Sequence, residues 1–336
     1  MSSAIGRRNR VKRRFPARLK YLLILSLVVI AMCFRFRSDS INYYNSDATW
    51  HTLLTVECYR ETPVSQHMFL PIVSLGAADD KYIPWGACLP DSEGNYYYTS
   101  FSAAGFFAAW LFLKITQLPV AEFSLYIWNN LLLAVSAVLL MYLIALVHKD
   151  KKYKDLLSLI AGLTYIWAPE ILHGQGVVYW THSIMQVTLL LQIIFWYQYA
   201  IVGKNRPKCL IYPMAFINPY VEWTGYVANV GFALPEIIRL WKCDKRKAIS
   251  TGFVFATATL TSFALFCGHY LLRLERTAFF ATIRERFFDC GLAANIAFTD
   301  LLARYFKSNL YVWLLLLLLL VGCFLFKKSL SSNEVC

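Results

Sequence analysis

Long apolar runs alternate with short basic clusters along most of the chain. Several runs, such as residues 123–147 and 248–272, are longer than a core helix of a soluble protein needs to be. About 20 apolar residues in a helix cross the ~30 Å hydrocarbon core of a bilayer, where every backbone polar group must be satisfied within the protein. The pattern therefore predicts an all-α polytopic membrane protein with no separate soluble domain.

The positions of the apolar runs predict about eight transmembrane helices. The expected spans are residues 21–34, 123–147, 156–172, 177–202, 209–220, 225–241, 248–272 and 310–326. The run 209–220 is short and contains Pro213 and Pro219, which is typical of a broken helix that lines a cavity.

Basic clusters then indicate the topology. They lie at residues 7–14, 149–154, 204–208, 242–247 and 327–328. The positive-inside rule assigns these clusters, and with them both chain termini, to the cytoplasm. Only one crossing then fits between the outer loop and the cluster at 149–154, although two apolar runs lie there. The run 101–118 is broken at Gly105 and ends at Pro119, so we interpret it as a juxtamembrane or re-entrant helix in the first outer loop.

These assignments divide the chain into seven consecutive parts. They are a basic cytoplasmic N-terminus (1–20), a first transmembrane helix (21–34), an outer loop with the juxtamembrane helix (35–122), a transmembrane bundle (123–272), an outer amphipathic segment (273–309), a last transmembrane helix (310–326) and a cytoplasmic tail (327–336). No small-residue cleavage site follows the first helix, so we expect an uncleaved anchor.

Composition agrees with a membrane protein, because 58% of the residues are hydrophobic and only 16% are charged. The net charge of +13 is also typical of nucleic-acid binding. The Lys and Arg residues, however, lie mostly beside apolar runs, where topology and anionic lipid head groups account for them. We therefore expect membrane lipids, and no nucleic acid, among the partners.

The outer loop begins with a candidate catalytic residue. Asp47 lies close to Trp50 and His51 in a polar stretch behind the first span. A carboxylate at this place suits proton abstraction from an acceptor hydroxyl, or proton relay in a transporter. The structural alternative is a helix N-cap, because Asp caps helices well.

Metal and cofactor chemistry has little support in the sequence. Asp79 and Asp80 could coordinate a divalent cation, although an adjacent acidic pair is more often solvated surface. The chain has no CxxC or HExxH motif and no glycine-rich phosphate loop, so we predict no metal site, no cofactor and no nucleotide chemistry. Cys58 and Cys88 share the outer loop and could form a disulfide in an oxidising compartment.

Two short outer turns add candidate substrate contacts. Trp and Tyr side chains stack on the apolar faces of sugars. A carboxylate at the membrane rim, such as that of Glu222, is costly unless it pairs with another group or lines water. The predicted substrate-binding residues are Trp50, His51, Asp79, Asp80, Tyr179, His182, Glu222 and Trp223. The alternative for the aromatic members is a belt at the membrane interface.

The outer segment 273–309 carries basic residues on the side where the positive-inside rule disfavours them. Because Arg forms bidentate, charge-assisted hydrogen bonds to phosphate, we predict that this segment binds phosphate. The predicted phosphate-binding residues are Arg273, Arg276, Arg284 and Arg286. The alternative is an amphipathic helix that lies on lipid head groups with its Phe side chains buried.

The layout resembles a known superfamily. A basic N-terminus, a first span, an outer loop that opens with residues 46–51, and the stretch 96–101 before a juxtamembrane helix look similar to the GT-C glycosyltransferases. Protein O-mannosyltransferases and aminoarabinose transferases of lipid A belong to that superfamily. The resemblance covers roughly the first 240 residues at the level of layout. Residues 99–102 depart from the His-Pro-Pro sequence that often follows the loop in that superfamily.

The resemblance implies a function. It implies an inverting glycosyltransferase of the bacterial inner membrane that moves a sugar from a polyprenyl-phosphate carrier to a periplasmic glycan or lipid-linked acceptor. Asp47 matches the first-loop acid that serves as general base in the superfamily. Such a donor needs no nucleotide site.

Two other functions remain open at this point. A transporter or flippase of a lipid-linked saccharide would use the same cavity, with Glu222 and His182 as a proton relay and Asp47 as a cap. A structural subunit would only stabilise a larger membrane complex. Acidic residues at one membrane rim would favour the enzyme, whereas acidic residues at the midplane would favour the carrier.

Overall fold

The computed structural model describes residues 17–37, 46–74, 81, 87–168, 171–172, 178–288 and 298–308, together with residues 310, 313, 314, 317 and 318. The chain is mostly helical, as expected for an all-α protein. The helices that follow the predicted apolar runs are α1 (Ala17–Arg37), α5 (Glu122–Val147), α6 (Lys154–Trp167), α7 (Thr181–Ala200), α8 (Lys208–Val221), α9 (Thr224–Trp241) and α10 (Lys245–Tyr270).

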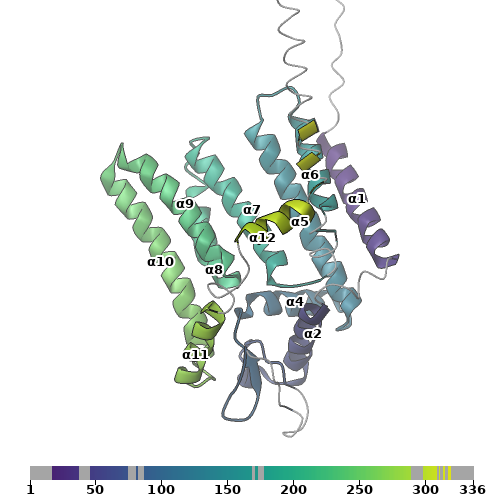
Figure 1. Cartoon of the computed structure of the whole chain (residues 1–336), viewed down its shortest axis with the longest axis vertical. Coiled ribbons are helices and arrows are strands. Elements are labelled where there is room, and N and C mark those ends of the chain that lie inside the picture. The colour runs from purple at the N-terminus through teal and green to yellow at the C-terminus, as the bar shows by residue number, and fades with distance from the viewer. Residues whose placement is uncertain are drawn as a thin grey trace, which may run out of the picture.

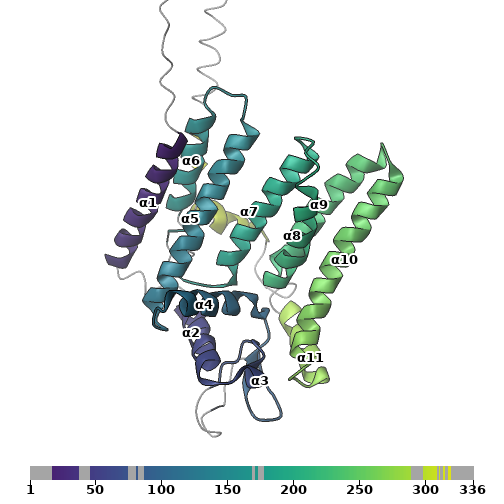
Figure 2. The same cartoon turned by 180° about the vertical axis from the view of Figure 1, so that it is seen from behind.

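These long helices stand side by side, and a second layer covers one of their ends (Figures 1 and 2). In this layer α4 (Ala103–Thr116) runs across the ends of the long helices, which is the orientation expected of a juxtamembrane helix. Helices α2 (Ser46–Glu61), α3 (Val64–His67) and α11 (Arg276–Phe287) lie at the same end, whereas α12 (Phe298–Ser308) lies about halfway along the long helices in both views.

Local signals explain the bounds of α4. The Ser102 hydroxyl accepts a hydrogen bond from the Ala104 N–H, which caps the N-terminus of the helix. At the other end Gln117 adopts a left-handed conformation with φ of 58°, and Pro119 follows, so the helix cannot continue.

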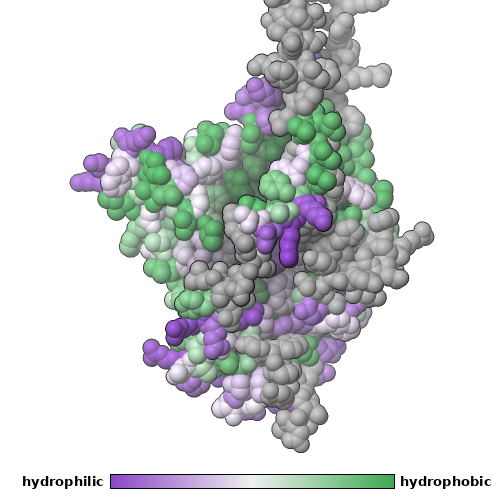
Figure 3. Space-filling view, viewed as in Figure 1, coloured by the Kyte–Doolittle hydropathy of each residue, from purple (hydrophilic) through white to green (hydrophobic). Residues whose placement is uncertain are grey.

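Hydropathy gives weak support for a membrane location. Among the described residues, α5 and α10 are long and apolar enough to cross a bilayer, and shorter apolar helices cover residues 19–33 and 103–116. In Figure 3, hydrophobic side chains cover much of the visible face of the long helices, and hydrophilic side chains gather at the turn between α9 and α10 and around the opposite end. The expected count of about eight spans exceeds these helices, and most of the last expected span, residues 310–326, lies outside the described residues.

Buried amides connect the helices inside the bundle. Gln192 of α7 donates to the Asn229 side chain of α9 over 3.1 Å, and Asn218 of α8 donates to Gln192. Asn229 donates to the Ala215 carbonyl over 2.6 Å and to the Thr259 hydroxyl of α10 over 2.8 Å. The three amide side chains are almost fully buried, so this network pairs most of their polar atoms in apolar surroundings, with Asn218 Oδ1 left without a partner.

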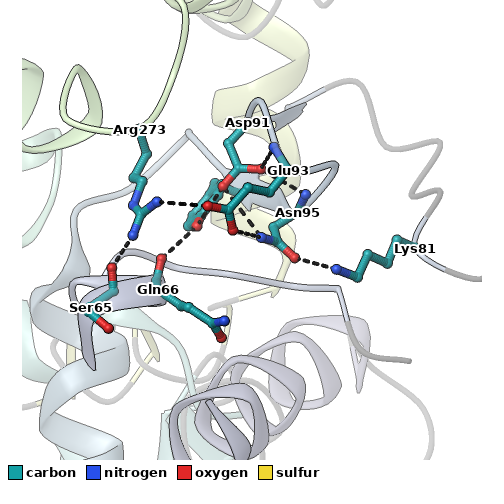
Figure 4. Close-up of polar contacts among 8 residues, drawn as sticks. Ser65, Gln66, Lys81, Asp91, Glu93, Asn95 and Arg273 are labelled. Atoms are coloured by element: carbon teal, nitrogen blue, oxygen red, sulfur yellow. Dashed lines mark hydrogen bonds and ion pairs between the residues drawn. The ribbon is translucent and has the colours of Figure 1, made fainter. Parts of the chain in front are cut away.

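The outer loop contains a short β-hairpin that the sequence pattern did not predict. Strand β1 (Cys88–Pro90) pairs antiparallel with β2 (Tyr96–Tyr98). The Asp91 carboxylate fixes the turn by accepting hydrogen bonds from the N–H groups of Glu93 and Asn95, each over 2.9 Å (Figure 4). Cys58 and Cys88 are both buried and both are free thiols, so the disulfide considered from the sequence is not formed.

The hairpin is attached to the bundle through the end of α10. The Tyr270 hydroxyl donates to the Tyr98 carbonyl over 2.6 Å and to the Phe101 carbonyl over 2.7 Å. Arg273 donates to the Ser65 carbonyl and lies 3.8 Å from the Glu93 carboxylate (Figure 4). These contacts join segments that are far apart in the sequence, and they set the position of residues 98–101 above the bundle.

Candidate functional site

Polar side chains from several segments meet at the end of the bundle that α4 covers. The contributing segments are α2, residues 99–102, the start of α7, the turn between α8 and α9, and α11. His51, His182, Glu222, Trp223 and Arg286 belong to this group, and they were all named as candidates from the sequence.

His51 lies inside a box of aromatic rings. Its ring centroid is 4.3 Å from that of Tyr98, 5.6 Å from that of Trp180 and 5.9 Å from that of Phe106. Burial lowers the pKa of His51 from 6.5 to about 4, because a charged imidazolium loses its hydration there. The imidazole is therefore neutral at pH 7.

This burial predicts a pH-dependent stability. Between about pH 6.5 and pH 4 the unfolded chain holds a proton on His51 and the folded chain does not, so acid favours unfolding. We expect this residue alone to lower the free energy of unfolding by about 3 kcal/mol across that interval. The measurement is chemical unfolding in micelles at a series of pH values. His51→Phe keeps a ring in the box and removes the titrating group, and an equal acid loss in parent and variant would contradict the prediction.

Glu222 holds a carboxylate in the turn that follows α8. Its side chain accepts hydrogen bonds from the Thr224 hydroxyl and, over 3.3 Å, from the Thr224 N–H. His182 Nδ1 lies 3.6 Å from the other carboxylate oxygen. Burial raises the pKa of Glu222, but the contacts from His182 and Thr224 outweigh it and lower the pKa below its usual value. Glu222 is thus ionised at neutral pH and lies against an imidazole.

Residues 100 and 101 connect the separate parts of the site. Trp223 Nε1 donates to the Ser100 carbonyl over 2.6 Å, and Arg286 Nε donates to the Ser100 hydroxyl over 3.1 Å. The Phe101 ring lies 5.3 Å from Trp180 and 6.0 Å from His182, centroid to centroid. Residues 100–101 thereby place an arginine, a tryptophan and the Glu222 turn around one point.

The space enclosed at this point is small. Phe101, Ser102, Glu222, Trp223 and Tyr226 contribute to the wall of a cavity of about 10 Å³. This volume holds one water molecule and no sugar ring. A substrate would therefore bind on the outer side of the site, or after the covering layer has moved.

Three other candidates from the sequence occupy different environments. Asp47 and Trp50 lie in the first turns of α2, and both are exposed. Tyr179 is buried and structural: its hydroxyl donates to the Gly105 carbonyl over 2.6 Å and its N–H donates to the Thr49 hydroxyl over 3.1 Å. Asp79 and Asp80 lie outside the described residues.

The four arginines do not form one cluster. Arg273 is engaged by Glu93 and Ser65, as described above, and Arg286 contacts Ser100. Arg284 lies 5.8 Å from the centre of the Phe288 ring, and Arg276 is exposed at the start of α11. No group of His, Cys, Asp or Glu side chains suited to a metal ion occurs in the part of the chain that the structure describes.

Sequence reasoning missed residues 100 and 101, although they connect the site. The only signal was a pair of small polar residues, Thr99 and Ser100, directly before the apolar run of α4. That pattern predicts a helix start, which Ser102 provides, and it gives no hint of the contacts with Trp223 and Arg286.

No protein-family model, curated protein or solved structure matches this chain.

Proposed function

We propose that this protein is an integral membrane glycosyltransferase of the GT-C type, in the bacterial inner membrane, with about eight spans and both termini in the cytoplasm. In this proposal it transfers a sugar from a polyprenyl-phosphate carrier to a glycan or lipid-linked acceptor on the periplasmic side.

One observation carries the proposal. The site that joins His51, His182, Glu222 and Arg286 lies at the end of the bundle, whereas the buried hydrogen-bond network that connects α7, α8, α9 and α10 consists of uncharged groups. A proton-coupled carrier usually needs titratable groups near the midplane. The buried Glu236 is the exception, but it lies near the opposite end of α9 and forms two hydrogen bonds with Arg239. This distribution favours an enzyme over a carrier.

In the proposed reaction Asp47 removes the proton from an acceptor hydroxyl. The acceptor oxygen then attacks the anomeric carbon of the sugar, and the bond from that carbon to the phosphate oxygen breaks with inversion. The phosphate leaves with the electron pair, and Arg286, which contacts Ser100 in the site, stabilises its charge. Trp50 and Trp223 offer faces for sugar stacking, while the Glu222 carboxylate, beside His182, accepts hydrogen bonds from sugar hydroxyls.

Arg273 has a different role in this scheme. Its guanidinium contacts the Glu93 carboxylate and the Ser65 carbonyl, so it is already used to hold the hairpin against the end of α10. We therefore assign Arg273 to the framework of the outer layer. Of the other three arginines, Arg286 is the one that contacts the site, through Ser100, and we retain it as the phosphate contact.

Sugar transfer tests the proposal directly. The purified protein in liposomes should transfer sugar from a polyprenyl-phosphate donor, and Arg286→Gln should weaken donor use by about ten- to a hundredfold, because a charge-assisted contact is lost. Arg206→Gln is the matched control, because Arg206 is exposed between α7 and α8, away from the site, and it should leave the donor KM within about twofold. Absence of transfer by the parent protein with every such donor would contradict the function, and equal effects in both variants would contradict the role of Arg286.

The topology has a separate test. Lys151 lies after α5 and Glu285 lies in α11, and the proposal assigns them to the cytoplasmic and periplasmic sides. A membrane-impermeant thiol reagent added to intact cells should label Glu285→Cys above the level of the parent chain, and it should label Lys151→Cys only after the cells are opened. The reverse pattern would invert the proposed orientation.

A further inference from the structure

A second, larger cavity lies between α2 and α4, apart from the site described above. Its volume is about 450 Å³. It is lined by Val56, Tyr59, Arg60, Trp110, Leu113, Lys114, Gln117, Leu118, Pro119 and Val120. One wall comes from the second half of α2, and the other comes from the C-terminal half of α4 and the residues that lead to α5. The space is therefore in the layer that covers the end of the bundle.

The polar part of the lining is positively charged. Arg60 and Lys114 supply two cations, and no acidic residue lines the cavity among the residues that the structure describes. Glu57 contacts Arg60 from its own helix, with 3.0 Å between Oε2 and Nη1, and so holds the guanidinium in place. Lys114 Nζ lies 4.6 Å from the centre of the Trp110 ring. Both cations are thus positioned by neighbours and reach the same space.

The rest of the lining is apolar, and the outside of the cavity is apolar as well. Val56, Leu113, Leu118 and Val120 form the aliphatic wall. On the adjoining face of α4, the exposed fraction is 71% for Ile115. A large aliphatic side chain that is this exposed, on a helix that lies across the ends of the long helices, is typical of a surface in contact with acyl chains.

We propose that this cavity binds one anionic glycerophospholipid, with its phosphate between Arg60 and Lys114 and an acyl chain along the aliphatic wall. A phosphodiester is the group that both cations recognise, and Gln117 adds an amide donor beside them. The lining contains nothing that selects a polyprenyl chain or a sugar. A site that opens to the bilayer with only these determinants is filled by the most abundant anionic lipid there, by mass action. This inference does not depend on glycosyl transfer.

Lipid titration of the full-length protein tests the site. The protein is purified in a zwitterionic detergent and titrated with phosphatidylglycerol, and native mass spectrometry gives the stoichiometry and the Kd. We expect one tightly bound phosphatidylglycerol, and we expect the double variant Arg60→Gln/Lys114→Gln to bind it about thirtyfold more weakly, because two cations near a lipid phosphate are lost.

The matched control removes the same charge elsewhere. Lys204→Gln/Lys208→Gln neutralises Lys204, which lies between α7 and α8, and Lys208, the first residue of α8. Lys208 Nζ lies 5.7 Å from the centre of the Tyr199 ring, much as Lys114 lies on Trp110. This control should keep the parental Kd within about twofold. Melting temperatures of both double variants show whether they are folded. If Arg60→Gln/Lys114→Gln is unfolded, the single variant Lys114→Met replaces it, because Met keeps an apolar side chain on Trp110.

Three results would overturn the inference. The first is an equal loss of lipid binding in both double variants, which would reduce it to general electrostatics. The second is that inorganic phosphate raises the melting temperature of the parent protein as much as phosphatidylglycerol does, which would make the ligand a free anion. The third is displacement of phosphatidylglycerol by an equimolar polyprenyl phosphate, which would reassign the cavity to the sugar donor.

Discussion

Replacing Asp47 by Asn should lower the rate of sugar transfer by about 10²–10⁴ and change the free energy of unfolding by no more than about 1 kcal/mol. Asp47 is the second residue of α2 and not its N-cap, so Asn removes only a favourable charge from the first turn of the helix. Asn cannot accept a proton from the acceptor hydroxyl, so the general base is lost. Activity and stability thus separate, which would not happen if the residue served only the start of the helix.

The measurement uses purified protein in liposomes with a saturating polyprenyl-phosphate donor, together with a melting curve for each variant. Glu61→Gln is the matched control, because Glu61 is an exposed acid at the other end of the same helix. It should keep the rate within about twofold. A rate of sugar transfer by Asp47→Asn close to that of the parent protein would contradict the assignment of Asp47 as the base.

Gly225→Ala should destabilise the protein by about 3 kcal/mol and disrupt the Glu222 turn. A Cβ atom at Gly225 would overlap the backbone of Asn218 and Pro219, because α8 and α9 meet there without room for a side chain. Backbone atoms cannot give way as the end of a flexible side chain can. The turn would shift, and Glu222 would lose its position beside His182.

Gly231→Ala serves as the control for this change. Gly231 lies further along α9, and nothing lies within 4 Å of the position that its Cβ would take. Ala favours a helix over Gly, so this variant should be more stable than the parent by up to about 1 kcal/mol. Thermal unfolding of both variants in the same detergent is the test, and equal melting temperatures would show that the contact at Gly225 is unimportant.

Local signals in the sequence predicted much of the framework. The apolar runs up to residue 272 coincide with the long helices, and the stop at Pro119 agrees with the end of α4, whereas the expected break at Gly105 is wrong because α4 continues through it. Such features depend on residues that are close in sequence, since periodicity and helix stops act within a few turns. The β-hairpin was not predicted, because Tyr96, Tyr97 and Tyr98 lie in a polar loop without a clear alternation of apolar and polar residues.

The partners of the candidate site residues could not be predicted in the same way. Arg273 and Arg276 are neighbours in the sequence, yet Arg273 contacts Glu93 of the hairpin and Arg276 opens a new helix. The pairs formed by His182 with Glu222, and by Ser100 with Arg286, likewise join separate helices and loops. Local patterns in a single sequence do not reveal which distant side chain will face a given side chain, because that depends on how the helices cross.

The buried amide network has a mechanical consequence. If α8 slid along its neighbours by one residue, the hydrogen bond from Asn218 to Gln192 and the one from Asn229 to the Ala215 carbonyl would both break. In an apolar interior these bonds have no water to replace them. Helices α7 to α10 are therefore locked in register and should move as a rigid body. If the proposed sugar donor enters this site, we therefore expect α2, α4 and the hairpin to be displaced relative to these helices.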